Sequence, residues 1–302
     1  MRKSHVVIIG PGAIGCAVGS ALTEAGHDVT FCSRQPFERV SVEKVGGAST
    51  LFPARVVLSG KDVPSADWVL LCVKAHQVPS AAGWLAAATG PRTKVAVLQN
   101  GVEQRERTEP FVPEGTTIVP VVVDLPASRA APGEVTWHSR ALLSVAESAS
   151  GKEFCTLFTG SFVTASTTDD LITRAWAKLC VNAPGGAILA LTGQPMRVFH
   201  KAGVVDVARA ILQECIAVGR AEGAKLDDAL VDRQIEIFLK AGPDEGNSMY
   251  ADRMAGREME WDARNAVIVR KGALHGIATP VSAALVPLLA ALNPSSQAGD
   301  AA

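Results

Sequence analysis

The charged residues of the sequence show almost no excess of either sign. Its 302 residues include 29 lysines and arginines and 30 aspartates and glutamates. A protein that binds nucleic acid or an anionic membrane through its overall charge needs a surplus of basic residues. The composition therefore argues against both kinds of partner, and any anion-binding site in this chain must be local.

Several common site patterns are also absent. The six cysteines form no CxxC pair and the six histidines form neither HxH nor HExxH, so no zinc site is expected. No GxSxG stretch occurs, which removes the usual nucleophile elbow of hydrolases. Most of the cysteines lie inside apolar runs, where a free thiol packs as a small hydrophobic side chain, and this favours a reducing cytoplasm.

Long apolar runs are missing as well. The longest late run, Val281–Leu292, contains Pro287 and is too short to span a bilayer. The small, polar residues from Asn293 onward predict a frayed tail. No internal repeat is visible. With 48% hydrophobic residues at this length, the sequence favours two domains with separate cores.

The N-terminus imitates a secretory signal without meeting its requirements. Arg2 and Lys3 precede a weakly polar stretch that reaches Leu22. Three glycines and Pro11 interrupt that stretch, and the residues after it make a poor cleavage site. We therefore expect the segment to remain in the mature protein.

The stretch VVIIGPGAIG at residues 6–15 gives the strongest functional signal. Its aliphatic residues predict a buried strand over Val6–Ile9, and the residues after the turn predict a helix over Ala13–Ala25 that Gly26 ends. A second strand follows over Asp28–Cys32. This strand–turn–helix–strand order is the context in which glycines at this spacing indicate dinucleotide binding.

The three glycines have separate roles in that prediction. Gly10 permits the tight turn, Gly12 lets the backbone approach a pyrophosphate, and Gly15 lets the helix pack on the strand. The helix N-terminus, with Ala13 and Ile14, offers unpaired N–H groups to the anion.

The end of the second strand predicts which dinucleotide is bound. An acidic residue there hydrogen-bonds the ribose 2′-hydroxyl, whereas an arginine accommodates a 2′-phosphate. The sequence has Arg34 and no carboxylate at the strand end. A guanidinium pairs bidentately with phosphate, so NADP(H) is favoured. The alternative is a solvated Arg34, with Glu38 as the ribose partner.

The two halves of the sequence differ in their periodicity. Apolar runs separated by helical patterns are typical of a parallel sheet buried on both faces, and they occur at Val6–Ile9, Val29–Cys32, Trp68–Val73, Val95–Leu98 and Thr117–Val123. Residues 40–60 predict a short excursion of strands, and Glu134–Val145 predicts a hairpin.

Helical patterns dominate after Thr168. They cover residues 169–183, 205–222, 227–241, 250–272 and 280–291. We therefore predict an α/β fold in which a Rossmann-type dinucleotide-binding domain over residues 1–167 is followed by an all-α domain over residues 168–302.

Polar side chains follow two of the predicted parallel strands. Lys74, with Gln77 close behind, lies at the carboxyl end of one strand, the edge where open α/β sheets bind ligands. Asn100 repeats that position at the next strand. The alternatives are a solvated lysine and an asparagine that serves only the Asn-Gly turn.

Three polar residues, Arg174, Lys178 and Asn182, share one face of a predicted helix at i, i+4 spacing. An amine and an amide would project together from it, or the face is an ordinary solvated stripe.

Taken together, the chain resembles the ketopantoate reductase (2-dehydropantoate 2-reductase) family from its N-terminus to about Pro280. The order and spacing of the fragments carry the resemblance: GPGAIG at 10–15, Arg34, KAHQ at 74–77, QNG at 99–101, AKLCVN at 177–182, NSM at 247–249, EMEWDARN at 258–265 and HGIATP at 275–280.

The resemblance implies NADPH-dependent reduction of a 2-oxo acid, 2-dehydropantoate first among them, to a 2-hydroxy acid. Lys178 matches the family's catalytic lysine, which stabilises the oxyanion and donates a proton. Glu260 matches the glutamate that binds substrate and holds the lysine; by spacing alone it could simply pair with Arg264. The remaining matches are Asn100, Asn182 and Ser248 in the polar pocket and Lys74, Gln77 and Asn100 on the cofactor side.

One position departs from the family. Gly186 stands where the family commonly has a second asparagine, and Pro184 with its two following glycines predicts a broken or bent helix. The reaction class survives this change, but another, bulkier 2-oxo acid becomes an alternative substrate.

Two rival functions remain at this stage. A β-hydroxyacid or opine-type dehydrogenase would more naturally use NAD(H) or a histidine base, which Arg34 and Lys178 argue against. An NADP(H) sensor would need neither Lys178 nor Glu260. The resemblance leaves the oligomeric state open, with a homodimer among the expected assemblies.

Overall fold

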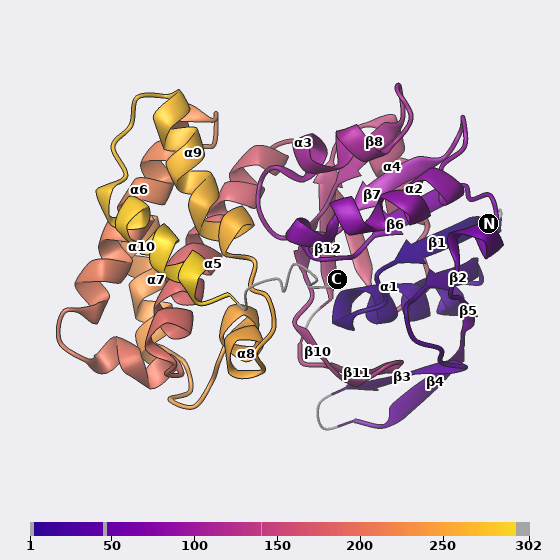
Figure 1. Cartoon of the computed structure of the whole chain (residues 1–302), viewed down its shortest axis with the longest axis horizontal. Coiled ribbons are helices and arrows are strands. Elements are labelled where there is room, and N and C mark those ends of the chain that lie inside the picture. The colour runs from indigo at the N-terminus through magenta and orange to yellow at the C-terminus, as the bar shows by residue number, and fades with distance from the viewer. Residues whose placement is uncertain (1–2, 45–46, 140, 294–302) are drawn as a thin grey trace, which may run out of the picture. The chain divides into compact units, whose positions relative to one another are not determined.

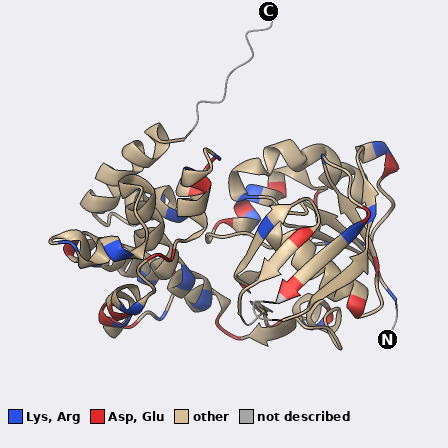
Figure 2. Ribbon diagram, turned by 90° about the horizontal axis from the view of Figure 1, so that it is seen from below, with Lys and Arg blue, Asp and Glu red and all other residues tan. Residues whose placement is uncertain are grey.

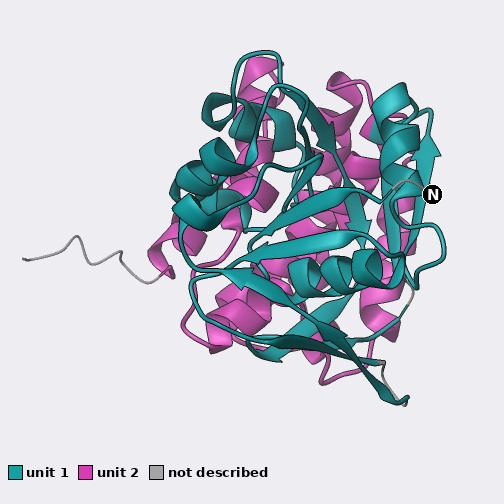
Figure 3. Cartoon of the chain, turned by 90° about the vertical axis from the view of Figure 1, so that its right-hand side faces the viewer, with its two compact units in different colours: residues 1–171 teal, residues 172–302 magenta. Residues whose placement is uncertain are grey.

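The computed structural model describes residues 3–44, 47–139 and 141–293. The chain forms two compact units, Met1–Leu171 and Ile172–Ala302 (Figures 1 and 3). The predicted boundary after residue 167 falls within the last strand of the first unit, β13 (Thr164–Thr168). The predicted frayed tail lies outside the described residues apart from Asn293.

The first unit is built on a six-stranded parallel sheet with the order β5-β2-β1-β6-β7-β8. Its strands are β1 (His5–Ile9), β2 (Asp28–Cys32), β5 (Arg55–Val57), β6 (Trp68–Leu71), β7 (Lys94–Val97) and β8 (Thr117–Pro120). The chain runs outward from β1 in one direction and then returns to its other side at β6. This order confirms the predicted Rossmann-type fold, and ligands bind such sheets at the carboxyl ends beside this reversal.

Alternate residues of each central strand enter two different cores. Val6 and Ile8 of β1 pack in one cluster with helix α1 (Ala13–Glu24), whereas Val7 and Ile9 pack in another with helix α2 (Ala82–Ala88). Because both faces are buried, the strands are continuous apolar runs, which is why the sequence predicted them.

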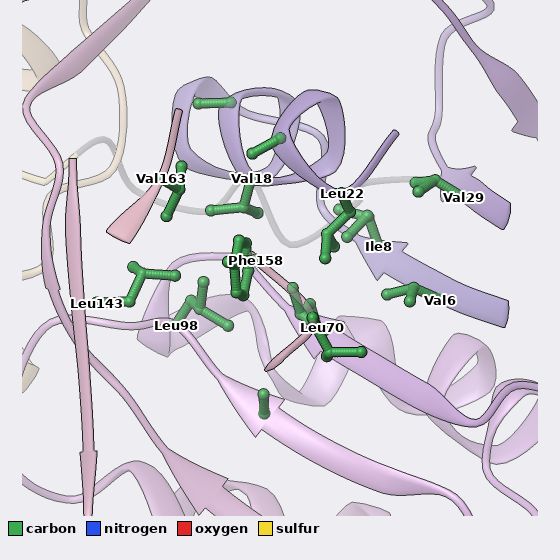
Figure 4. Packing of buried hydrophobic residues seen from close by; sticks show 14 of the residues in the cluster. Val6, Ile8, Val18, Leu22, Val29, Leu70, Leu98, Leu143, Phe158 and Val163 are labelled. Atoms are coloured by element: carbon green, nitrogen blue, oxygen red, sulfur yellow. The ribbon is translucent and has the colours of Figure 1, made fainter. Parts of the chain in front are cut away.

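The core on the α1 side also holds residues from the second half of the unit. Figure 4 shows Val18, Phe158 and Leu98 pointing into one cluster. The helices of this unit are α1, α2, α3 (Gln104–Thr108) and α4 (Ala149–Thr156).

Two smaller sheets complete the first unit. One has the order β10-β11-β3-β4 and the other β13-β12-β9. Their remaining strands are β3 (Arg39–Lys44), β4 (Ser49–Pro53), β9 (Val122–Asp124), β10 (Ala127–Ala131), β11 (Glu134–Trp137) and β12 (Leu142–Ala146). β3 and β4 form the predicted strand excursion, an antiparallel pair.

The predicted hairpin over Glu134–Val145 is wrong. The hairpin is β10–β11, which turns at Pro132-Gly133, while β12 pairs with β9 and β13 instead. A Pro-Gly pair is a turn signal, and it lies before β11 rather than after it.

The predicted strand over Thr117–Val123 is divided. β8 ends at Pro120, and β9 begins at Val122 in a different sheet. Proline cannot donate to a strand ladder, so the apolar run changes sheets at this residue.

The second unit is helical. Its helices are α5 (Leu171–Thr192), α6 (Val204–Ala221), α7 (Ala229–Lys240), α8 (Ser248–Met254), α9 (Val267–Leu274) and α10 (Pro280–Ala291), with a π-helical turn, η6 (Asp262–Ala266), before α9. The single helix predicted over residues 250–272 is wrong: α8 ends at Met254, Gly256 leaves helical geometry (φ +63°), and η6 then runs directly into α9.

Helix α5 corrects the predicted break at Pro184. It continues to Thr192 with Pro184 inside it. A Cβ on Gly185 would meet Phe238 at 3.3 Å, and one on Gly186 would meet Met249 at 2.7 Å. The two glycines therefore let neighbouring side chains approach the helix, and this packing outweighs their low helix propensity.

Basic and acidic residues are interspersed over both units (Figure 2). Within the part of the chain that the structure describes, none of the helices combines the length and apolar character that a membrane crossing requires.

Candidate cofactor and active site

The glycine turn after β1 is held by two close backbone approaches. Gly10 has φ +89°, and a Cβ there would lie 2.7 Å from the backbone nitrogen of Val73. A Cβ on Gly15 would lie 2.3 Å from the carbonyl oxygen of Gly10 and 3.2 Å from Cys72 Cβ. The absence of side chains at both positions brings the start of α1 against the carboxyl ends of β1 and β6.

Gly12 differs from these two glycines. A Cβ there would meet no described atom within 4 Å, so protein packing does not require a glycine. The first intrahelical bond runs from the Cys16 N–H to the Gly12 carbonyl at 2.9 Å, and among the described residues no side chain caps α1. The N–H groups of Ala13 and Ile14 thus lack helical acceptors, as a pyrophosphate site requires.

The thiols beside this turn are uncharged at neutral pH. Burial raises the pKa of Cys16 to about 11, against smaller lowering effects of Arg129 and the Gly133 backbone. Burial also raises the pKa of Cys72, and the neighbouring Cys16 adds to the rise. Neither sulfur therefore places a negative charge against an incoming phosphate.

Arg34 follows β2 and is exposed. The preceding Ser33 hydroxyl donates to the Gln35 carbonyl at 2.7 Å and accepts from the Gln35 N–H at 3.1 Å, which fixes the local turn. The strand end contains no carboxylate, so the position fits the predicted contact with a 2′-phosphate, which stays a prediction.

Lys74 and Gln77 lie in the turn after β6, next to β1 in the sheet. The Lys74 backbone N–H donates to Gln77 Oε1 at 3.3 Å. Both side chains are half-buried. The structure therefore brings these two predicted cofactor residues to the same edge of the sheet as the glycine turn.

Asn100 lies at the corresponding end of β7, before Gly101 with φ +97°. Gly101 thus has the left-handed backbone that the Asn-Gly turn considered as the alternative role requires. The preceding residue, Gln99, is buried and donates from Nε2 to the Val73 carbonyl at 2.9 Å, tying the ends of β7 and β6 together. The sequence showed Gln99 only as part of the QNG fragment. The hydrogen bond to Val73 could not be predicted, because the two residues are 26 positions apart in the sequence.

In the second unit, Lys178 and Asn182 are half-buried one turn apart on α5, while Arg174 is exposed. The next position on that face is Gly186, where Met249 Sδ occupies the space that a side chain would need. Met249 directly follows Ser248, the first residue of α8. The thioether therefore replaces the amide that the resemblance led us to expect.

A buried arginine joins two further predicted site residues. Arg264 Nη2 donates to Glu260 Oε2 and to Ser248 Oγ, both at 2.9 Å. The side chains of Arg264 and Glu260 are only 3% and 7% exposed. The ion pair considered as an alternative for Glu260 is thus present, and it also connects Glu260 to Ser248, which the sequence did not predict.

The π-helical turn η6 provides this geometry. It contains Arg264 and Asn265, and the Asn265 side chain donates from Nδ2 to the Ala183 carbonyl on α5 at 2.9 Å. Such turns are frequent at functional sites. The turn links the helix that carries Asn182 with α8, which begins at Ser248, and with Glu260, which lies in the segment just before the turn.

The two glycine contacts give a matched pair of predictions. Gly15→Ala should lower both the unfolding midpoint and dinucleotide affinity, because its Cβ overlaps the Gly10 carbonyl. Gly12→Ala should keep the midpoint and lose affinity, because its Cβ enters only the space meant for the pyrophosphate. Thermal unfolding and dinucleotide titration measure both effects, with Gly83→Ala in α2 as a neutral control. Normal affinity in Gly12→Ala would contradict the assignment.

Two family models match the chain: "Ketopantoate reductase PanE/ApbA" over residues 6–149 and "Ketopantoate reductase PanE/ApbA C terminal" over residues 170–293. These matches are with dinucleotide-binding oxidoreductases.

Individual relatives agree over nearly the whole length. A 2-dehydropantoate 2-reductase of Caulobacter vibrioides is 43% identical over 289 residues, covering 95% of this chain and 98% of that protein. One of Mycobacterium tuberculosis is 40% identical, covering 95% and 97%. The crystal structure of a PanE/ApbA family ketopantoate reductase from Ralstonia eutropha JMP134 superimposes with a TM-score of 0.86 at 31% identity, covering 95% of this chain and 98% of that one. The chain therefore belongs to the ketopantoate reductase family, as its motifs predict.

Proposed function

We propose that this protein reduces a 2-oxo acid to a 2-hydroxy acid with NADPH, and that 2-dehydropantoate is its substrate. The observation that carries the proposal is the full-length relationship, at 43% identity, to a 2-dehydropantoate 2-reductase. The glycine turn supports it, since its helix start fits the pyrophosphate of a dinucleotide.

The cofactor is NADP(H), held by residues at the carboxyl edge of the parallel sheet. When bound, it supplies the hydride. The backbone from Gly10 to Gly15 holds the pyrophosphate, and exposed Arg34 pairs with the 2′-phosphate. Lys74, Gln77 and Asn100 contact the cofactor from the neighbouring strand ends.

Lys178 carries the proton chemistry. Its ammonium stabilises the negative charge that develops on the carbonyl oxygen and then donates a proton to it. Glu260 accepts a hydrogen bond from a substrate hydroxyl, from a position fixed by Arg264. Asn100, Asn182 and Ser248 orient the polar groups of the substrate.

A related 2-oxo acid is the second candidate substrate. The space beside Gly186 is occupied by Met249 Sδ, which is apolar and accepts hydrogen bonds only weakly. This wall favours a substrate whose corresponding group is apolar. The opine-type dehydrogenase and the NADP(H) sensor lack a comparable supporting observation.

We further propose that the protein works in the reducing cytoplasm, where its six free cysteines stay reduced. The homodimer stays a prediction, which sedimentation of the purified chain tests.

A panel of 2-oxo acids tests the proposed reaction. With 2-dehydropantoate present, the wild type should oxidise NADPH faster than NADH, as followed by nicotinamide absorbance. Arg34→Ala should reduce this preference by weakening the binding of NADPH and not that of NADH, because NADH has no 2′-phosphate. A preference for NADH would contradict the cofactor assignment. NADPH binding without turnover of any 2-oxo acid would favour the sensor.

Lys178→Ala tests the proton donor. Loss of a positioned general acid typically lowers the rate ~10²–10⁴-fold, so kcat should fall by this amount while NADPH affinity stays near the wild-type value. Lys201→Ala, which removes an exposed lysine of the same unit, is the matched control. Equal turnover in the two variants would contradict the assignment of Lys178 as the proton donor.

Variants of Arg264 and Glu260 distinguish a role of Glu260 toward the substrate from its contribution to the stability of the fold. Arg264→Met removes the guanidinium that pairs with the buried Glu260 carboxylate and should cost ~3–5 kcal/mol of unfolding free energy. Adding Glu260→Gln removes that charge and should recover much of the loss without restoring turnover. Urea unfolding and steady-state kinetics measure the two quantities. Full turnover in the double variant would show that Glu260 has no role toward the substrate.

A further inference from the structure

Arg129 lies far along the chain from the glycine turn but reaches it in space. It belongs to β10, and its Nη1 donates to the Pro11 carbonyl at 3.2 Å. Cys16 Sγ donates to the same oxygen at 3.2 Å. Because Pro11 lies between Gly10 and Gly12, the guanidinium is beside the part of the turn that the pyrophosphate approaches. We propose that Arg129 binds a phosphate group of the dinucleotide, an inference that rests on the proposed cofactor site.

The local fold aims this side chain at α1. Arg129 is paired with Val135 of β11, and residues directly opposite in an antiparallel pair share a face. Val135 is buried in the same cluster as Cys16 of α1. The strand register shifts between Arg129 and Ala131. A register shift interrupts the regular ladder, and β-bulges, one cause of such shifts, re-aim side chains and are common next to active sites.

The turn that joins β10 to β11 packs against β3. Gly133 has φ +76°, and a Cβ there would lie 2.5 Å from the Arg39 carbonyl. Its own carbonyl accepts from the Ser41 N–H at 2.7 Å. The turn is therefore packed tightly against β3, and this packing fixes the end of β10, which follows Arg129.

The guanidinium has unused capacity for an anion. It carries five N–H donors, and the Pro11 carbonyl engages one nitrogen. In residues 3–44, 47–139 and 141–293, no carboxylate forms an ion pair with Arg129, which is exposed. The Pro11 carbonyl accepts from the guanidinium without neutralising it. The positive charge of Arg129 therefore lies at the turn, next to the uncharged thiol of Cys16.

Two phosphates of the cofactor have the required chemistry. The pyrophosphate is common to NADPH and NADH, whereas the 2′-phosphate occurs only in NADPH. Titration with both cofactors distinguishes the two phosphates. If an Arg129 variant binds NADPH and NADH more weakly by the same factor, Arg129 contacts the pyrophosphate. If only NADPH binding is weakened, Arg129 contacts the 2′-phosphate.

The decisive variant is Arg129→Gln, which keeps a donor for the Pro11 carbonyl but removes the charge. We expect the dissociation constant of the tighter-binding cofactor to rise about tenfold, the usual effect of losing one charge-assisted hydrogen bond. The cofactor affinity of Arg129→Lys should lie between those of Arg129→Gln and the wild type, because lysine keeps the positive charge but lacks the planar guanidinium. The loss should shrink at high salt, since both partners are near the surface.

Nicotinamide fluorescence titrations of the full chain measure these affinities. The control is Arg92→Gln, an exposed arginine before β7, at the opposite edge of the sheet. Affinity of Arg129→Gln within twofold of the wild type, or an equal loss in the control, overturns the inference, as does a wild type that binds neither cofactor. A wild type that binds NADPH but reduces no 2-oxo acid would instead refute the proposed reaction and leave the Arg129 comparison intact.

Discussion

The helix that follows the first strand begins so close to the strand's end that residues 10 and 15 have no room for side chains. The Gly10 carbonyl lies where a Cβ of residue 15 would be, and the backbone of Val73 lies where a Cβ of residue 10 would be. This contact joins three separate pieces of chain, β1, α1 and the end of β6. The helix start, Lys74 and Gln77 therefore share one edge of the sheet, and the proposed cofactor chemistry depends on that arrangement.

Much of the first unit could be predicted because its signals are short-range. Strands buried on both faces are continuous apolar runs, and the glycine spacing is local. The errors occurred where pairing is non-local. Nothing in the residues of Glu134–Val145 indicates that β12 pairs with β13 and β9 rather than with β11. Arg129 escaped notice for the same reason, since Pro11 is 118 residues away.

In the second unit, most helix positions followed from periodicity, but the helix predicted over residues 250–272 did not, nor did the contacts between helices. Pro184 and its glycines predicted a broken or bent helix, yet Phe238 and Met249 pack against the two glycines and the helix continues without a break. The i, i+4 spacing of Glu260 and Arg264 was visible, whereas the bond from Arg264 to Ser248 was not. Residue types at the candidate site can thus be predicted from sequence, while the hydrogen bonds that fix them require coordinates.

The four-stranded sheet with the order β10-β11-β3-β4 has two edges, and each carries a feature that hinders the addition of another strand. β10 is distorted by its irregular register, and β4 ends in Pro53, which has no N–H to offer. Edge-to-edge aggregation through this sheet is therefore disfavoured. If two copies of the chain associate, they are expected to do so through side-chain surfaces rather than by extending this sheet from one copy into the next.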